Sequence, residues 1–414
     1  MIVSGYTIDR GRSYELDQNS PGTATVTLID TTGELDPTGG SYLFNPGTPA
    51  AIALRNPVTG ADSTIFRGHV TRIDYDLYQT EDYAIVTVDM VDGLDRLARM
   101  EMYGGQGWGS VWGDFPRLGQ DGDVSFFADD QSNAVANRIN KILDQADWPT
   151  GLREIFSGNV SLQGVNYAYR TSALTAIQDS ADAEFPGVAN FYIQKDGRAT
   201  FHGRLARFQP LSSQYHISIW RCGDMAAVAA DSTRAPIFEL AYDRDVEKVI
   251  NSAMATPQNI PDADIDGQRV EDTASIAQYG TRAISFDNLL TAGDPISGQG
   301  YGYIDPLPLE ATYLFAWYYV ANYAQPRTRV NKITFKRVGP EHPYAARLWA
   351  LMCGVDISDI IRLTTSHIGG GFAEEDYYVE GIHYSASPLS DDYVDVELTL
   401  DVSPRAYYGT NPFS

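Results

Sequence analysis

The sequence is short of cysteine, of basic residues and of long apolar runs. Its 2 cysteines, Cys222 and Cys353, exclude a disulfide framework and a C-x-x-C zinc site. Both lie in partly apolar stretches, which predicts reduced thiols that pack in the core. The longest membrane-like run, at 313–321, is far too short to span a bilayer, and the N-terminus lacks a signal-peptide core. We therefore expect a soluble protein made in a cytoplasm.

Basic residues are outnumbered. The chain has 30 Lys and Arg against 54 Asp and Glu, a formal net charge of -24 over 414 residues. The sequence has no excess of basic residues that could bind phosphate groups, so sequence-specific nucleic-acid binding is not expected. The charge favours a protein that stays soluble, or one that lines a path along which DNA slides without sticking.

Motifs for catalysis are also missing. The six histidines (His69, His202, His216, His342, His367 and His383) show no zinc spacing, and no G-x-S-x-G elbow occurs. The glycine-rich stretch at 368–372 lacks the Lys and Ser/Thr of a phosphate loop, and acidic pairs are too abundant to single out a glycosidase pair. The sequence predicts no catalytic residue, no cofactor and no enzyme activity.

One stretch weakly resembles a calcium loop. Asp262, Asp264 and Asp266 stand at the first, third and fifth positions of such a loop, and Gly267 follows. The twelfth position, normally Glu, is Thr273, and no clear helix flanks the stretch. A solvated acidic loop is the alternative interpretation.

The length allows two to four domains, and the patterns divide the chain into three parts. Residues 1–105 read mostly as strands, which are predicted at 21–30, 50–54, 66–78 and 83–92, followed by a short helix capped by Asp92. A Gly- and Trp-rich passage near 105 marks a boundary.

The middle part, 106–235, has a different character. Helical spacing of apolar residues predicts helices at 130–148 and 171–186, the second capped by Thr171 or Ser172. A hairpin that turns at 195–198 follows. We interpret this part as an inserted α/β domain.

In the third part, 236–414, strands return around a helical insert at about 300–352. The helix at 308–326 is apolar or aromatic on nearly every side, so we expect it to be buried between elements or at a partner surface. A second helix at 342–354, a strand at 355–365 and a long hairpin complete the chain.

The two ends of the chain look like copies of one unit. An apolar strand precedes an alternating hairpin at 50–92 and again at 357–403. We align Gly68 with Gly381 and Tyr83 with Tyr393. A trimer with two such barrels per chain would make a ring of six on one face and stay three-fold on the other.

The opening segment "DRGRSYELDQNSPGTATVTLIDTTGELDP" (9–37) resembles the start of minor tail proteins of long-tailed bacteriophages, especially those of actinobacteria. "LTAIQDSADAEF" and "YIQKDGRATFHGR" resemble the inserted domain of the tail hub family, and "DVEKVINSAMAT" resembles its re-entry into a second barrel. The resemblance implies a mainly β fold with α+β inserts, in which two tail-tube-like barrels alternate with smaller α/β domains, as in phage baseplate hubs.

This family resemblance also implies a function. The chain would be a homotrimeric hub in the virion tail tip that joins the six-fold tail tube or distal tail ring to the three-fold tip. Its partners would be the tube or distal tail protein, the tape-measure protein and tip or fibre proteins, with DNA passing through the lumen. The chain ends about a dozen residues after the last strand, so we do not expect an appended hydrolase.

Three alternatives stay open. A distal tail protein would form a hexamer with one barrel per chain, which the apparent second barrel disfavours. A tail-associated cell-wall-degrading enzyme would need catalytic residues that the sequence does not reveal. A receptor-binding protein normally has fibre repeats or a lectin-like domain, and neither is seen.

Overall fold

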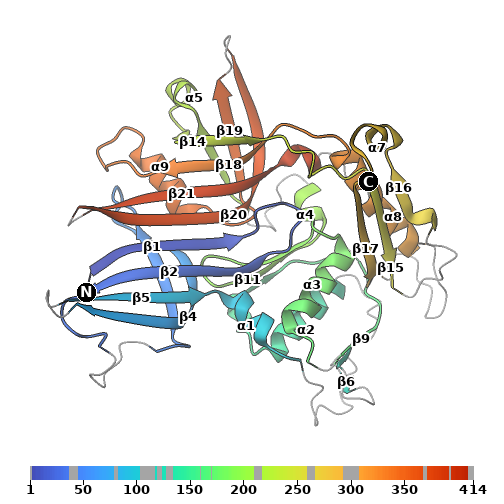
Figure 1. The fold of residues 1–414 in the computed structure, drawn as a ribbon, viewed down its shortest axis with the longest axis horizontal. Helices are drawn as coiled ribbons and strands as arrows, with labels where there is room; N and C mark the ends of the chain where they lie inside the picture. The colour runs from blue at the N-terminus through green and yellow to red at the C-terminus, as the bar shows by residue number, and fades with distance from the viewer. Residues whose placement is uncertain are drawn as a thin grey trace.

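The computed structural model describes residues 2–36, 45–78, 83–102, 117–118, 124–126, 134–158, 160–168, 170–208, 217–258, 266–291, 307–366, 371–390 and 393–408 (Figure 1). Long strands run side by side through one half of the molecule, and most helices gather around the other half. The expected class, mainly β with α+β inserts, is confirmed.

The first strand unit consists of five strands: the four that the sequence predicts, and β1 (Ile2–Gly11), which was not predicted. In the last of the five every second residue from Ala84 to Met90 is buried. Helix α1 (Gly93–Arg99) follows, and the carboxylate of Asp92 accepts a hydrogen bond from the backbone N–H of Leu94, as the predicted cap should. The strands are β1 (Ile2–Gly11), β2 (Ser20–Asp30), β3 (Pro49–Arg55), β4 (Asp62–Tyr78) and β5 (Tyr83–Val91).

The inserted segment after α1 has the two predicted helices and the predicted hairpin. Ser172 caps the second helix by accepting from Thr175. The helices and hairpin share an apolar cluster with Leu94 and Leu97 of α1. The elements are β6 (Arg117–Leu118), β7 (Val124–Phe126), α2 (Ala134–Gln145), η1 (Thr150–Leu152), β8 (Arg153–Ile155), β9 (Val165–Tyr167), α3 (Ala173–Glu184), β10 (Asn190–Ile193), β11 (Ala199–His202) and α4 (Leu205–Phe208).

The rest of the chain returns to long strands. The elements are β12 (Ile219–Gly223), α5 (Met225–Ala230), β13 (Ala235–Pro236), β14 (Glu239–Asp243), β15 (Ser252–Pro257), η2 (Asp266–Gln268), β16 (Arg269–Glu271), α7 (Thr273–Tyr279), β17 (Ala283–Leu289), α8 (Leu307–Tyr323), β18 (Arg329–Lys336), α9 (Ala345–Gly354), β19 (Ile360–Ser366), β20 (Phe372–Ser390), β21 (Tyr393–Pro404) and η4 (Arg405–Tyr408).

Helix α8 is mostly buried, as its composition predicts. Phe315, Tyr318 and Tyr319 are fully buried in an aromatic cluster with Phe185, whereas Trp317 is 38% exposed. The acidic stretch at 262–273, for which no flanking helix is expected, contains β16 in its described part and leads directly into α7. β16 forms there because β15 offers it a pairing edge, and Asp272 caps α7.

Twelve strands of the described residues form one sheet (Figure 1). β14, β18, β19, β20 and β21 make up a second strand unit. Within each unit all pairings are antiparallel, and the order β3-β4-β5-β2-β1 matches β19-β20-β21-β18-β14. The chain also visits the strands in the same order, so the structure confirms the internal repeat.

Local geometry repeats as well. Both long strands are bulged, between Val70 and Arg72 in β4 and between Val379 and Gly381 in β20. Val70 exchanges hydrogen bonds with the backbone of Gly47 and Thr48, and Val379 does so with Ser358 and Asp359.

These bulges correct the alignment of the two copies. Val70 is equivalent to Val379, so Arg72, not Gly68, takes the place of Gly381. Asp89 and Asp401 face the two bulges, which aligns Tyr83 with Asp395 instead of Tyr393. Glycine and tyrosine occur often in hairpins, so matching them gave the wrong alignment of the two copies. Strand pairing identifies the equivalent residues directly.

The expected closed barrels are not observed, because no sheet closes on itself within the described residues. β20 pairs on one side with β21 and on the other with β19 and then β1, so the two units join edge to edge. The outer edge of β14 and the edge of β4 beyond Val70 pair with no described strand. The sheet therefore remains open at both margins.

The two units approach closely where β1 ends. Gly11 lies opposite Gly381, and Gly11 has φ +89°, a left-handed conformation that favours glycine. A Cβ atom on Gly11 would lie 2.2 Å from the carbonyl oxygen of Glu380, and one on Gly381 would lie 2.7 Å from that of Arg12. Side chains are excluded at this crossing by backbone on both sides.

We expect Gly381→Ala to lower the stability of the chain. The added methyl group meets backbone that cannot rotate away, and such overpacking costs about 1–3 kcal/mol. Thermal unfolding should show a reduced Tm. Gly339→Ala is the matched control, because nothing lies within 4 Å of a Cβ atom there; equal Tm values for both variants would contradict the close approach.

Candidate functional site

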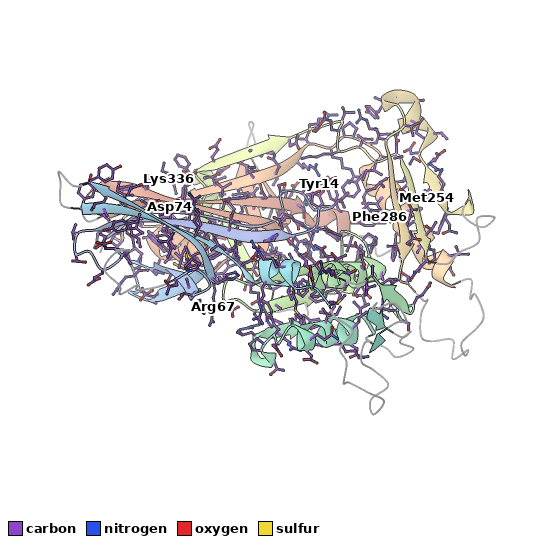
Figure 2. The ribbon with its side chains drawn as sticks, turned by 60° about the horizontal axis from the view of Figure 1, so that its bottom comes forward. Tyr14, Arg67, Asp74, Met254, Phe286 and Lys336 are labelled. Atoms are coloured by element: carbon purple, nitrogen blue, oxygen red, sulfur yellow. The ribbon has the colours of Figure 1, made fainter. Side chains whose placement is uncertain are left out.

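The segment that follows β1 lies where the two strand units, the inserted segment and the aromatic cluster meet. Figure 2 shows Tyr14 in this central position, between the long strands and the small sheet that carries Met254 and Phe286. Arg10 and Arg12 are both buried here. Their side chains reach the inserted segment and the second strand unit. We call this region the central junction.

Glu380 is the centre of the central junction. The Nε of Arg12 donates to Glu380 at 2.8 Å, and Arg207 of α4 donates through both terminal nitrogens, Nη2 at 2.9 Å. Ser403 adds a hydrogen bond of 2.5 Å. Burial alone would raise the pKa of Glu380, but the two guanidinium groups outweigh burial and lower this pKa to about 2.

Asp356 forms a second bridge of the same kind. Arg10 donates to Asp356 at 2.9 Å and to the carbonyl of Ile193 at 2.8 Å. The backbone N–H of Lys195, at the tip of the β10–β11 hairpin, donates to the other oxygen of Asp356. Three parts of the chain therefore meet at one carboxylate.

Lys195 also binds the end of α9. Its Nζ donates to the carbonyl oxygens of Cys353 and Gly354, at 2.9 and 2.5 Å, where a helix leaves carbonyls without partners. Burial lowers the pKa of Lys195. The predicted hairpin turn thus positions a cation against the second strand unit.

Glu15 and Tyr14 extend the junction toward α8 and β18. Arg329 donates to Glu15 at 2.8 Å, and its guanidinium lies over the ring of Tyr14 at 5.1 Å. Farther along, Asn19 donates to the carbonyl of Phe191 at 3.0 Å. The segment that carried the sequence resemblance therefore acts as the tie between parts.

His383 forms a clasp between the two strand units. Its Nδ1 lies 2.6 Å from Asp9 of β1, and its Nε2 lies 2.6 Å from Asp401 of β21. Hydrogen bonds to Asp401 and Asp9 outweigh burial and raise the pKa of His383. Lys332 of β18 lies 3.6 Å from Asp401 and completes the charged groups around the clasp.

The face of the sheet that carries this clasp is acidic. Cross-strand pairing brings its charged side chains onto one face, opposite the apolar core. Acidic residues outnumber basic ones. The acids are Asp9, Asp74, Asp76, Asp89, Glu239, Asp395, Glu397 and Asp401, and the bases are Arg72, Lys332 and Lys336.

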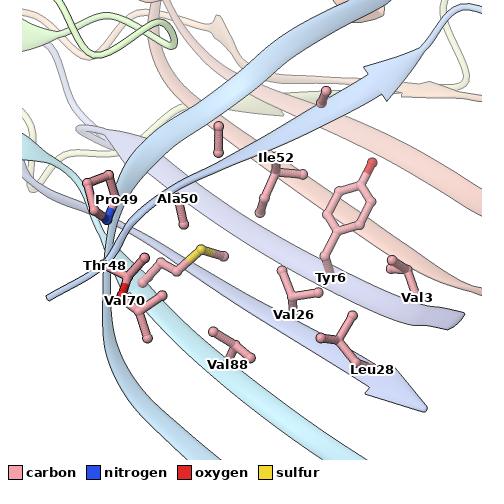
Figure 3. A pocket seen from close by; sticks show the side chains of 13 residues that line it. Val3, Tyr6, Val26, Leu28, Thr48, Pro49, Ala50, Ile52, Val70 and Val88 are labelled. Atoms are coloured by element: carbon pink, nitrogen blue, oxygen red, sulfur yellow. The ribbon is translucent and has the colours of Figure 1, made fainter. Parts of the chain in front are cut away.

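The opposite face of the first strand unit borders an apolar hollow of about 490 Å³ (Figure 3). Tyr6, Val26, Val88 and Ile52 point into it from four strands. Helix α9 contributes Leu348, Trp349 and Met352 to the apolar cluster that both strand units share. The thiol of Cys353, near the end of α9, lies 4.0 Å from the carbonyl oxygen of Leu54 in β3, so this helix also contacts the first strand unit.

The structure tests few of the chemical expectations. Cys222 and Cys353 are buried free thiols, as predicted. Asp262 and Asp264 lie outside the described residues, and Asp266 begins η2, so the calcium loop stays a prediction. In the described part of the chain no group of His, Cys, Asp or Glu is arranged to hold a metal. None of its helices is long and apolar enough to cross a membrane.

The residues of the central junction were not singled out in the sequence. Arg10 lies in β1 and Arg12 follows the last residue of that strand, Gly11, so strand alternation gives no signal that the two arginines share a role. Glu380, Arg207 and Asp356 lie far away in the chain, and only the folded structure brings them together.

Sequence comparison finds no protein-family model and no curated protein that matches the chain. Structural comparison does find matches. A tail protein from Neisseria meningitidis MC58 has TM-score 0.54 and 10% identity, over 99% of this chain and 94% of that one. The 43 kDa tail protein of prophage MuSo2 from Shewanella oneidensis has TM-score 0.52 and 11% identity, over 99% and 96%.

These likenesses cover nearly the whole of each chain, inserts included. The chain therefore has the fold of phage tail proteins, and the resemblance expected from the sequence is confirmed. At such low identity the likeness defines the fold alone.

Glu380→Gln should destabilise the chain strongly. Breaking a buried ion pair leaves cations uncompensated and costs about 3–5 kcal/mol. Because the pKa is lowered in the folded state, this contribution is present above the ordinary Glu pKa of about 4.3 and is lost as pH falls toward 2.

Urea unfolding at several pH values would measure this effect. The gap between the parent chain and Glu380→Gln should be full at pH 7 and shrink below pH 4. Glu239→Gln, at an exposed position, serves as the control. A gap that does not change with pH would contradict the ion-pair account.

His383→Gln should remove a pH-dependent contribution of opposite sign. The raised pKa of His383 means that the clasp stabilises fully below the ordinary His pKa of about 6.5 and is lost as pH rises through the raised value. The effect at pH 6 should be only about 0.5 kcal/mol, because the side chain is 35% exposed and solvent screens it. Thermal unfolding at pH 6 and pH 9, with His342→Gln as control, checks this; an equal loss at both would refute it.

Proposed function

We propose that the chain is a structural component of a phage tail, and specifically a homotrimeric hub that adapts a six-fold tube or ring to a three-fold tip. The phage tail fold supports the structural role. The observation that carries the finer proposal is the internal repeat: two strand units with one connectivity, joined edge to edge by β1 and β20.

The repeat has a direct geometric use. A six-fold partner presents six equal surfaces, and three chains can match them only if each supplies two similar units. A distal tail ring with one unit per chain would need six chains, so the repeat disfavours that alternative. We infer the division into a first tail-tube-like unit at 1–105, an inserted α/β domain at 106–235 and a second unit with its helical insert at 236–414.

The acidic face gives the proposed ring its inner surface. If the sheet curves so that this face lines a lumen, carboxylates from both units meet the DNA path. Like charge keeps a polyanion from adhering during passage. The expected partners are the tail tube or distal tail protein, the tape-measure protein and tip proteins, in the tail tip of the virion.

A non-enzymatic role agrees with the way the buried charges are used. Glu380, Asp356 and His383, the ionisable groups of the central junction and the clasp, each bind groups from other parts of the chain. Their arrangement fixes the relative positions of those parts. A cell-wall-degrading activity would show as clearing in a peptidoglycan gel, and such clearing would contradict the purely structural proposal.

The native mass of the purified chain tests the hub. We expect a trimer of about 137 kDa, three times the 45.5 kDa of one chain. Negative-stain images should show a ring with six lobes at one level and three-fold symmetry overall. A stable hexamer would instead favour a distal tail ring.

A further inference from the structure

We propose that β14 of one copy pairs antiparallel with β4 of a second copy, through the two strand edges that the sheet leaves open. The template is the junction inside the chain, where β1 pairs with β20 from Gly11 opposite Gly381 to Tyr6 opposite Ala386. In the repeat β14 is the counterpart of β1, and β4 beyond its bulge is the counterpart of β20. Figure 1 shows β14 and β4 at opposite margins of the sheet.

Strand pairing fixes which residues are equivalent. Thr25 pairs with Asp89 and Thr7, and Lys332 pairs with Asp401 and Ala241, so Thr7 corresponds to Ala241. Directly after Ala241 the pairing of β14 with β18 shifts by one residue, past Asn331 of β18, so the following positions are aligned by counting along β14 itself. Asp9-Arg10 in β1 corresponds to the same dipeptide, Asp243-Arg244, at the end of β14.

The register between copies follows from this alignment. The pairs Tyr6–Ala386, Ile8–Tyr384 and Asp9–His383 inside the chain have direct counterparts. Between copies they become Leu240 opposite Leu77, Tyr242 opposite Tyr75, and Asp243 opposite Asp74. The first two pairs are apolar and lie on the core face, as at the filled junction.

Exposure distinguishes the filled junction from the open edges. Ile8 is 0% exposed, whereas its counterpart Tyr242 is 60% exposed; Ala386 is 8% exposed, whereas Leu77 is 56% exposed. Arg10 is buried, whereas Arg244 is exposed. Large apolar side chains on two unpaired strand edges are unusual in a protein that acts alone, and a second copy would bury both.

The charged pair differs between the two junctions. Asp243 would face Asp74, with Asp89 at the position of Asp401, so three carboxylates replace the Asp–His–Asp clasp. Asp243 has Lys248 at 2.5 Å, and Asp74 has Arg72 at 2.6 Å, which offsets part of the repulsion. We therefore infer a weaker contact between copies than between the units of one chain.

The contact is head-to-tail, since β14 and β4 are different surfaces. Such contacts close into a ring or continue as a filament. The inference rests on the proposed function only for the number of copies, and the pairing itself rests on the repeat.

A designed disulfide tests the register. Asp243→Cys combined with Asp74→Cys places two thiols opposite each other, and the native cysteines are buried. After mild oxidation we expect linked dimers and trimers on a non-reducing gel. Asp243→Cys with Asp76→Cys, two residues along β4, is the matched control and should link far less.

Surface variants test the contact without threatening the fold. Tyr242→Asp and Leu77→Asp should each weaken association at least roughly tenfold, since each buries a carboxylate. Val58→Asp, at an exposed apolar position in the β3–β4 turn, should leave it unchanged. Asp74→His, which restores the clasp, should tighten it roughly threefold at pH 6 and not at pH 9.

The outcomes separate this inference from the hub. A trimer that is neither cross-linked by the matched pair nor weakened by Tyr242→Asp overturns the edge pairing and leaves the hub standing. Cross-linked ladders longer than a trimer support the pairing and overturn the closed three-chain ring. A chain that stays monomeric and yields no matched cross-link overturns both.

Discussion

The structure depends on the contact between β1 and β20. Two glycines let the backbones of the strand units meet, and directly beside them Glu380 holds Arg12 and Arg207 from two other parts of the chain. The apolar cores of the two units form one continuous cluster across this line. Strand pairing, apolar packing and buried ion pairs therefore all occur at the contact between β1 and β20. The same contact positions the inserted segment relative to the sheet.

Buried ion pairs are a costly way to join parts, because each charge loses its hydration. Apolar contacts would stabilise the chain equally well, but they allow the packed parts to shift relative to each other. A carboxylate held by two guanidinium groups accepts only one geometry. Glu380 is held in this way, and Asp356 is held by the guanidinium of Arg10 and the backbone N–H of Lys195, so each carboxylate fixes the relative positions of different parts of the chain.

Period-two patterning and helix caps were enough to predict most strands and helices, because these features are local. Asp92 and Ser172 cap the helices as expected. The central junction could not be predicted this way, because Arg12 and Glu380 are separated by 368 positions. The repeat was visible in outline only: Gly68 and Tyr83 suggested a register that strand pairing corrects by four and two positions respectively.

The two copies of the unit have diverged where it matters for assembly. At the junction inside the chain, Asp9 meets a histidine; at the open edges, the counterparts Asp243 and Asp74 are both acidic. A covalent chain keeps its own two units at high effective concentration, so the inner contact forms with folding. In the proposed assembly, the contact between copies would be weaker and would form only when copies meet. The repeated edge would then serve two steps, folding first and ring closure later, because the charge at one pair of positions differs.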